Sequence, residues 1–278
     1  MSRLVLVATP IGNLGDLSPR AAQVLAEAAL ICCEDTRRTG RLLQHAGVTA
    51  HRLAVCSEHT EAARIREVLD VLVAGGNVAV VTDAGTPGIS DPGERLVRAV
   101  LDAGLDVSTV PGPTAFVAAL VTSGLPTSRF VFEGFLPRAA KARRDRLAEL
   151  ATERRTIVVY ESPHRVARTL ADVTEAFGAD RHVSVARELT KLHETIVRVP
   201  LGEVELALER HGEPRGEYVL VIAGASDHSV RPDDDVIRAA IREERRNGAS
   251  TRDAAATVAR RLGVPKRLAY DLAVADTR

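Results

Sequence analysis

The chain has 278 residues, of which 45% are hydrophobic and 27% are charged, and its formal net charge is zero. This length and composition fit one large or two ordinary domains with a sizeable core, and they exclude a disordered chain. Because its net charge is zero, the chain lacks the positive electrostatic field that attracts polyanions. Because it has no Trp, it also offers little aromatic surface on which bases could stack. Any nucleic-acid site must therefore be local.

The cysteines and the N-terminus indicate a reducing compartment. Cys32, Cys33 and Cys56 form an odd set with one adjacent pair, which fits neither a disulfide framework nor a zinc site, so we expect buried thiols and no metal. Residues 1–12 hold one basic residue and an apolar stretch too short for a signal peptide, and no run is long enough to cross a bilayer. We therefore expect a cytoplasmic protein without a membrane partner.

Strands and helices alternate over residues 1–124, where we expect the first domain. Ser18 suits a helix N-cap and Pro19 the first helical position, while Gly75-Gly76 and Gly104 suit helix ends. Strands are expected at 3–8, 30–33, 78–82 and 106–110, and helices at 18–28, 61–74, 94–103 and 115–124. Because the strands are apolar throughout, this pattern predicts a parallel α/β sheet.

The pattern changes over residues 125–224, where we expect a second α/β domain with a more mixed sheet. Strands are expected at 129–135, 156–162, 182–189, 194–199 and 217–224, and helices at 141–153 and 202–210. A polar stretch at 225–235 predicts a linker, and 236–278 predict a small helical tail. Within it, 252–274 have the pattern of a helix-turn-helix, which is often only a packing unit.

Loops rich in Gly, Pro and small polar residues follow four of the expected strands. They lie at residues 8–13, 34–40, 83–93 and 111–115. Ligands of parallel sheets bind beyond the carboxyl ends of the strands, so we expect these loops to form a site at one rim, although any one of them could be an ordinary turn. None contains Gly-Lys, and G-x-G-x-x-G does not follow the first strand. With these phosphate-binding motifs absent, the loops suit a ligand that has an adenine, a ribose and a zwitterionic amino-acid tail and is bound largely through main-chain atoms.

Eight sequence blocks resemble one family in order over essentially the whole chain. They are LVATPIGNLGDLSPRA, EDTRRTGRLL, VTDAGTPGISDPG, VPGPTA, FEGFLPR, YESPHR, RELTKLHE and GEYVLVI. The chain resembles the tetrapyrrole methylase superfamily and, within it, the ribosomal RNA small-subunit methyltransferase I family. One departure is CSEHTE at 56–61, where the family usually has a segment like HEHNE.

The resemblance implies a class III methyltransferase fold, with a donor-binding cleft between two α/β domains and a C-terminal helix-turn-helix-like domain. It also implies 2′-O-methylation of a cytidine ribose in 16S rRNA near the decoding centre, S-adenosylmethionine as methyl donor, and a homodimer. The loop at 83–93 would wrap the methyl donor, because glycine allows close backbone approach. Implied donor-binding residues are Pro10, Ala84, Gly85, Thr86, Thr114, Ala115, Glu161, Ser162 and Leu220.

Methyl transfer to a ribose hydroxyl depends on holding the oxygen in line, and a nearby base or cation helps. Candidates in the loops are Glu34, Arg37, Glu133, His164 and Lys191. Glu34 and Arg37 could instead pair at a helix start, and His164 could cap or pack. Lys191 could lower the pKa of the hydroxyl or be a solvated charge.

Affinity for the 16S rRNA or the small ribosomal subunit must come from local basic patches. We expect phosphate contacts from Arg138, Lys141, Arg143, Arg144, Arg146 and Arg165. The basic runs at 242–252 and 260–267 in the tail add more, although all of these could be solvated helix faces.

Two other functions remain open from the sequence. The same scaffold could methylate a carbon of a corrin or porphyrin precursor, although a small substrate needs neither the arginine-rich helix nor the tail. The chain could also be a non-catalytic sensor that binds nucleic acid through the tail. Turnover of S-adenosylmethionine with RNA distinguishes these functions.

Overall fold

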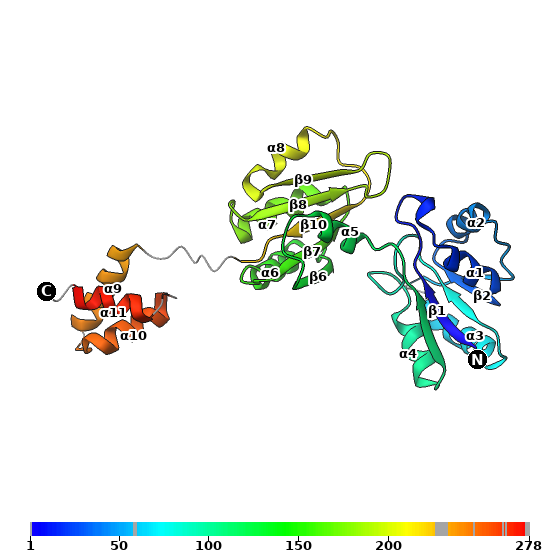
Figure 1. The fold of residues 1–278 in the computed structure, drawn as a ribbon, viewed down its shortest axis with the longest axis horizontal. Helices are drawn as coiled ribbons and strands as arrows, with labels where there is room; N and C mark the ends of the chain where they lie inside the picture. The colour runs from blue at the N-terminus through cyan, green and yellow to red at the C-terminus, as the bar shows by residue number, and fades with distance from the viewer. Residues whose placement is uncertain are drawn as a thin grey trace. The chain divides into compact units, whose positions relative to one another are not determined.

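The computed structural model describes residues 2–57, 60–225, 233–246, 248–262, 264 and 266–275. Its contacts divide the chain into two compact units, Met1–Gly224 and Ala225–Arg278. Figure 1 shows the first unit from blue to yellow and the helices of the second from orange to red. Each unit is described by itself.

The first sheet is parallel throughout, with strand order β3-β2-β4-β1-β5. Its strands are β1 (Arg3–Val7), β2 (Leu30–Cys33), β3 (Leu53–Val55), β4 (Val78–Val80) and β5 (Asp106–Val110). Helices α1 (Pro19–Glu27), α2 (Thr36–His45), α3 (Glu61–Val73), α4 (Glu94–Asp102) and α5 (Ala115–Thr122) alternate with them. Because the central strands are buried on both faces, their side chains are apolar without alternation.

The second sheet is mixed, as expected, with strand order β6-β7-β10-β8-β9. Only β6 and β7 run parallel to each other. Its strands are β6 (Phe130–Phe135), β7 (Thr156–Glu161), β8 (His182–Arg187), β9 (Thr195–Pro200) and β10 (Tyr218–Ile222). Helices α6 (Ala140–Leu150), α7 (Val166–Phe177) and α8 (Val204–Glu209) complete this half of the unit.

The two sheets are joined by packing into the single unit Met1–Gly224. One apolar cluster takes Leu120 from α5 and Val158 and Val221 from the second sheet. The Phe116 amide donates a 3.2 Å hydrogen bond to the Tyr160 hydroxyl. The carboxyl ends of the first sheet are therefore held against the second sheet.

Two α-helices and one strand were not predicted from the sequence: α2, α7 and β3. The segment at 34–40 was expected to be a loop, but Asp35 caps a helix by accepting a 2.7 Å hydrogen bond from the Arg37 amide. Thr39, Leu42 and Leu43 then form the buried face of α2. Burial of this face against the sheet outweighs the polar composition of the segment.

The second unit contains α9 (Asp234–Arg246), α10 (Thr251–Leu262) and α11 (Lys266–Ala275) around their own apolar core. Helices α10 and α11 lie where the helix-turn-helix pattern was expected. Most of the expected linker, residues 226–232, lies outside the described residues, and α9 begins at Asp234, inside the expected linker range. Cys32, Cys33 and Cys56 are buried and unpaired. Among the described helices, none combines the length and hydropathy that a bilayer span requires.

Candidate active site

A cavity of about 280 Å³ lies at the carboxyl ends of β1, β2, β4 and β5, where the segments at 8–13, 34–40, 83–93 and 111–115 all contribute to its wall. We call it the rim cavity. Its opposite wall comes from the second sheet, through residues 160–163 at the end of β7 and residues 217–219 at the start of β10. The volume is close to the lower end of the range of small-molecule sites, about 300–1,000 Å³.

Gly85 forms the tightest part of the loop at 83–93. Its φ is +84°, in the left-handed region that favours glycine. Its backbone pairs with Thr9 through two hydrogen bonds of 2.9 and 3.1 Å, which fix the first and third loops to each other. A Cβ at this position would lie 3.5 Å from Ile11 and 3.9 Å from the Pro113 carbonyl oxygen. The main chain at Gly85 therefore lines the cavity, with the Ile11 side chain beside it.

Five carboxylates make the rim cavity acidic: Glu34, Asp83, Asp91, Glu161 and Glu217. Burial raises the pKa of Glu34 and of Asp83, although Glu34 accepts a 3.0 Å hydrogen bond from the Asp83 amide. Among the described residues, Asp83 Oδ1 is buried with no hydrogen-bond partner, while Oδ2 pairs with Arg38 at 3.2 Å. A buried acceptor of this kind is completed when a ligand supplies a donor.

The remaining wall of the rim cavity is apolar and aromatic. Ile11 and Ala115 come from the first half, and Phe135, Tyr160 and Val219 from the second. Burial raises the pKa of Tyr160 to about 12, so this side chain is a neutral phenol at physiological pH. The cavity thus combines apolar and aromatic side chains with concentrated negative charge, which suits a ligand with a planar ring and a cationic group.

Most of the expected donor-binding residues line the rim cavity. They are Ala84, Gly85, Thr86, Thr114, Ala115, Glu161 and Ser162. The two threonine hydroxyls are 2.7 Å apart and connect the third loop to the fourth. Glu161 is buried, and its carboxylate accepts hydrogen bonds from Ser162 and Thr169, so it shapes the wall through internal contacts.

Pro10 and Leu220, which were also expected to bind the methyl donor, do not line the rim cavity. Both are buried, and Leu220 packs in the core on the far side of the second sheet. Val219 lines the cavity instead, because successive side chains of β10 point to opposite faces.

Of the catalytic candidates, only Glu34 lines the rim cavity. Arg37 is highly exposed at the start of α2 and pairs with Asp35, whereas its neighbour Arg38 lines the cavity. Lys191 does not line it and bridges Glu188 at 2.7 Å and Glu217 at 3.2 Å. These positions follow from the helical start of α2 and from the ion pairs of the loop after β8.

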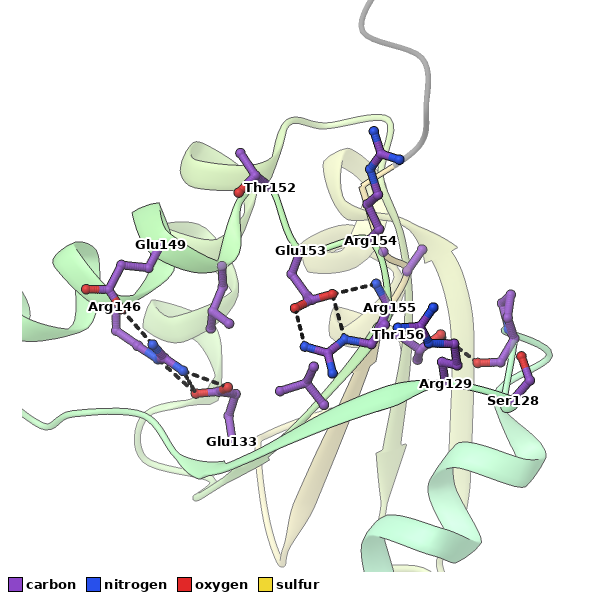
Figure 2. A pocket seen from close by; sticks show the side chains of 15 residues that line it. Ser128, Arg129, Glu133, Arg146, Glu149, Thr152, Glu153, Arg154, Arg155 and Thr156 are labelled. Atoms are coloured by element: carbon purple, nitrogen blue, oxygen red, sulfur yellow. Dashed lines mark hydrogen bonds and ion pairs between the residues drawn. The ribbon is translucent and has the colours of Figure 1, made fainter.

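Glu133 and His164 are also outside the rim cavity. Glu133 lies in a separate cavity of about 1020 Å³, which is also lined by Thr156, the first residue of β7. Figure 2 shows it there in a bidentate pair with Arg146, with distances of 2.8 and 2.9 Å, and Glu153 paired with Arg155. Glu133 is thus a partner for arginine, and His164 is exposed just beyond the cavity-lining Pro163.

The six expected RNA-binding residues divide into exposed and internally bound side chains. Arg138, Lys141 and Arg144 are exposed on or beside α6. Arg143 is buried and pairs with Asp172 at 2.6 Å, because it shares the inner face of α6 with Leu147 and Leu150. The structure therefore removes Arg143 from the surface patch. Arg146 pairs with two glutamates, and Arg165 donates to the Leu136 carbonyl and contacts Glu161.

Sequence reasoning missed several cavity-lining residues, of which Arg38, Asp83, Asp91, Tyr160 and Glu217 are polar. Asp83 and Asp91 could have been found, because both belong to the Gly- and Pro-rich loop. Tyr160 and Glu217 lie on or beside strands of the second sheet, and only the packing of the two halves brings them to the rim. In the divergent segment at 56–61, residues 58 and 59 lie outside the described residues.

The family model for tetrapyrrole (corrin/porphyrin) methylases matches residues 3–205 of this chain. The chain belongs to this family. A ribosomal RNA small subunit methyltransferase I from Synechocystis is 45% identical, over 99% of this chain and 98% of that protein. The protein of the same name from Xylella fastidiosa (strain Temecula1) is 48% identical over 82% of this chain and 83% of its own length. The Mycobacterium bovis protein of that name is 45% identical over 99% and 96%.

Solved tetrapyrrole methylases share the fold of the first unit. A uroporphyrin-III-C-methyltransferase from Thermus thermophilus has a TM-score of 0.54 at 20% identity, over 80% of this chain and 94% of that one. The methyltransferase CobJ has a TM-score of 0.61 at 23% identity, over 81% and 95%. A structure of the Thermus enzyme is described as complexed with S-adenosyl homocysteine. At these identities the likeness establishes the fold alone, and the near relatives show that this chain belongs with the proteins named ribosomal RNA small subunit methyltransferase I.

Proposed function

We propose that this chain transfers a methyl group from S-adenosylmethionine to the 2′-oxygen of a cytidine ribose in 16S rRNA, near the decoding centre. The observation that carries the proposal is a near full-length match to methyltransferases of small-subunit rRNA, combined with an acidic cavity formed by the expected loops. Because its substrate is a ribosomal subunit, the enzyme acts in the cytoplasm.

The rim cavity fits S-adenosylmethionine by charge and shape. This methyl donor supplies an electrophilic methyl group on a cationic sulfur, and it has a net positive charge at neutral pH. Glu34, Asp83 and Glu217 provide the opposite charge, and the buried unpaired oxygen of Asp83 accepts a hydrogen bond from a ligand amine or hydroxyl. Tyr160 and Val219 provide apolar surface for a planar ring.

Basic side chains on the first unit support binding of an RNA backbone. Arg138, Lys141 and Arg144 are exposed, and none of them has an ion-pair partner within the described part of the chain. Exposed cations of this kind neutralise phosphates and release counterions, which gives salt-dependent affinity. Arg143 and Arg165 support the same surface from within, through their contacts with Asp172 and with the Leu136 carbonyl.

The second unit has its own basic groove of about 460 Å³ between α10 and α11, which we call the tail groove. Arg252, Lys266 and Arg267 line it and are exposed. Tyr270 closes one side with 47% of its surface exposed, and Ala255 and Ala256 lie between the helices. Cations beside an exposed aromatic ring suit a single-stranded nucleotide, with phosphate on the cations and base on the ring.

We also propose that the enzyme acts as a homodimer. Val117 and Val121 are four residues apart on one face of α5 and are 45% and 64% exposed. This apolar face favours a second copy of the chain. Sedimentation of the wild type and of Val121→Asp tests it, because the variant is expected to shift toward monomer.

The function is tested by transfer of a radiolabelled methyl group to small ribosomal subunits from cells that lack this protein. Subunits from normal cells serve as the control, and mass spectrometry identifies the labelled nucleoside. Label on a cytidine ribose only in the deficient subunits is the expected result. Methyl-donor binding without label on deficient subunits or naked 16S rRNA would contradict the proposal and favour a tetrapyrrole substrate.

A further inference from the structure

Phe135 is the most exposed aromatic side chain of this chain, which has five Phe, three Tyr and no Trp. Its surface is 54% exposed, and it also contributes to the wall of the rim cavity. A ring that belongs to the wall and keeps half of its surface in solvent lies at the entrance of the cavity. Two features of the backbone, one on each side of the ring, direct it to this position.

The first feature is a β-bulge in β6 that turns the Phe135 ring toward the rim cavity. Phe132 pairs with Val158 and Phe135 pairs with Tyr160, so β6 has one residue more than β7 in this interval. Without the extra residue, Phe132 and Phe135 would face opposite sides of the sheet, because side chains alternate along a strand. With it, both rings contact the Tyr160 ring, at centroid distances of 5.0 and 5.6 Å. Gly134 allows the bulge, with a φ of +60°.

The second feature is the turn after β6, which is anchored from the inside of the protein. Leu136 is buried in the core of the second sheet. Arg165 donates hydrogen bonds of 2.9 and 3.3 Å to the Leu136 and Pro137 carbonyls. The buried Arg143 donates a 3.3 Å hydrogen bond to the Arg138 carbonyl. These contacts fix the backbone that connects the exposed ring to the Arg138 side chain.

The Phe135 ring and the Arg138 side chain together have the chemistry of a nucleotide site. The Arg138 side chain is exposed and has neither an ion-pair nor a hydrogen-bond partner among the described residues. An aromatic face stacks on a base, and a guanidinium binds a phosphate through two parallel hydrogen bonds. Lys141, in the first turn of α6, is a second exposed cation close by in the chain. At the entrance of the rim cavity, such a site brings the ribose of a bound nucleotide close to a methyl donor inside.

We propose that the base of the acceptor cytidine stacks on Phe135 and that Arg138 binds a phosphate next to it. The inference rests on the proposed function and assigns the position of the second substrate. Stacking on the protein requires a base that has left its own helix, so the acceptor is bound as an unstacked nucleotide. The anchored turn then holds the ribose oxygen in line with the methyl group, and positioning of this kind lowers the barrier to transfer.

The test uses the absence of Trp from the chain, since Phe135→Trp places a single fluorophore at the proposed stacking position. Its emission is expected to be quenched by small ribosomal subunits from cells that lack this protein, because a stacked base quenches an indole. Titration of the wild type gives the background emission of the subunit. Phe130→Trp is the matched control, because Phe130 lies at the other end of β6, is 38% exposed and does not line the rim cavity. Its emission should not change.

Filter binding to the same subunits measures the contact without a fluorophore. Phe135→Ala should lose about 5–150-fold in affinity, which corresponds to about 1–3 kcal/mol of stacking, and Phe135→Tyr should retain the affinity. Arg138→Gln should reduce the slope of log affinity against log salt by about 0.7, the value for one phosphate of a single strand. All of these measurements are made without S-adenosylmethionine, so none of them depends on affinity for the methyl donor.

Several results would overturn the inference. They are an unquenched Phe135→Trp, equal quenching of both Trp variants, equal affinity losses in Phe135→Ala and Phe135→Tyr, and an unchanged salt slope in Arg138→Gln. Quenching of Phe135→Trp by S-adenosylmethionine and not by subunits would assign the ring to the methyl donor. Emission that depends on protein concentration and not on subunits would assign it to a second copy of the chain. Failure of the wild type to label any cytidine ribose would instead overturn the proposed function.

Discussion

Gly85→Leu tests whether the main chain at 83–86 holds the methyl donor. The left-handed φ of +84° makes any side chain costly there, by about 1–2 kcal/mol. The Thr9 pairing prevents the backbone from relaxing to another conformation. For a chain of this size the cost corresponds to a fall in Tm of about 2–8 °C. The leucine carbons beyond Cβ must either fit between Ile11 and the Pro113 carbonyl or extend into the rim cavity, where they would occupy space meant for the ligand.

We therefore expect Gly85→Leu to remain folded at 25 °C and to lose at least about 100-fold in methyl-donor affinity, which is about 2.7 kcal/mol. Calorimetry with S-adenosylmethionine measures the affinity, and thermal unfolding measures the stability. Gly104→Ala is the matched control for strain, because Gly104 has a φ of +70° after α4 and a Cβ there would have no neighbour within 4 Å. It should lower Tm similarly and leave affinity unchanged. Wild-type affinity in a folded Gly85→Leu would refute the placement.

The remaining predictions separate RNA binding from stability. Replacing Lys141 and Arg144 by Glu should weaken binding to 16S rRNA in filter assays and reduce its salt dependence, with methyl-donor affinity unchanged; an unchanged salt slope would argue against the patch. Arg143→Ala should instead destabilise the fold by about 3–5 kcal/mol, because Asp172 is left without its buried partner. Urea unfolding measures this loss. A free energy of unfolding within ~1 kcal/mol of wild type, which is the limit for an exposed ion pair, would contradict the prediction. Tyr270→Ala should cost about 1–3 kcal/mol in RNA affinity by loss of stacking, with Tyr270→Phe retaining it; equal losses in both variants would exclude a stacking role.

Much of the fold follows from local patterns in the sequence. Continuous apolar runs identify β1, β2 and β4 as buried parallel strands, because only a strand covered on both faces has no need of polar positions. Ser18 caps α1 by accepting a 3.1 Å hydrogen bond from the Ala21 amide, as its residue type predicts. Helix α2 was missed, because its polar first turn reads as a loop until its apolar face is placed against the sheet.

The sequence predicts which way a side chain points on helix α6 but not on strand β10. Arg143, Leu147 and Leu150 follow the helical spacing of one face, so the burial of Arg143 could have been inferred from the apolar neighbours on its side of α6. Leu220 and Val219 are both apolar on a strand that is buried on both faces, so the sequence gives no sign of which faces the rim cavity.

The sequence by itself determined the parallel and mixed sheets, the loops at the rim and the family. Tertiary structure decided the chemistry of the site, because its interacting groups are far apart along the chain. The Glu34 carboxylate meets the Asp83 amide across 49 residues, and Phe116 meets Tyr160 across 44. The raised pKa of Asp91 depends mainly on burial, with smaller contributions from Glu34 and Glu217 in two other segments and from Asp83 at the start of its own loop. Local spacing records the periodicity of single elements, whereas desolvation and charge clustering arise only when those elements pack.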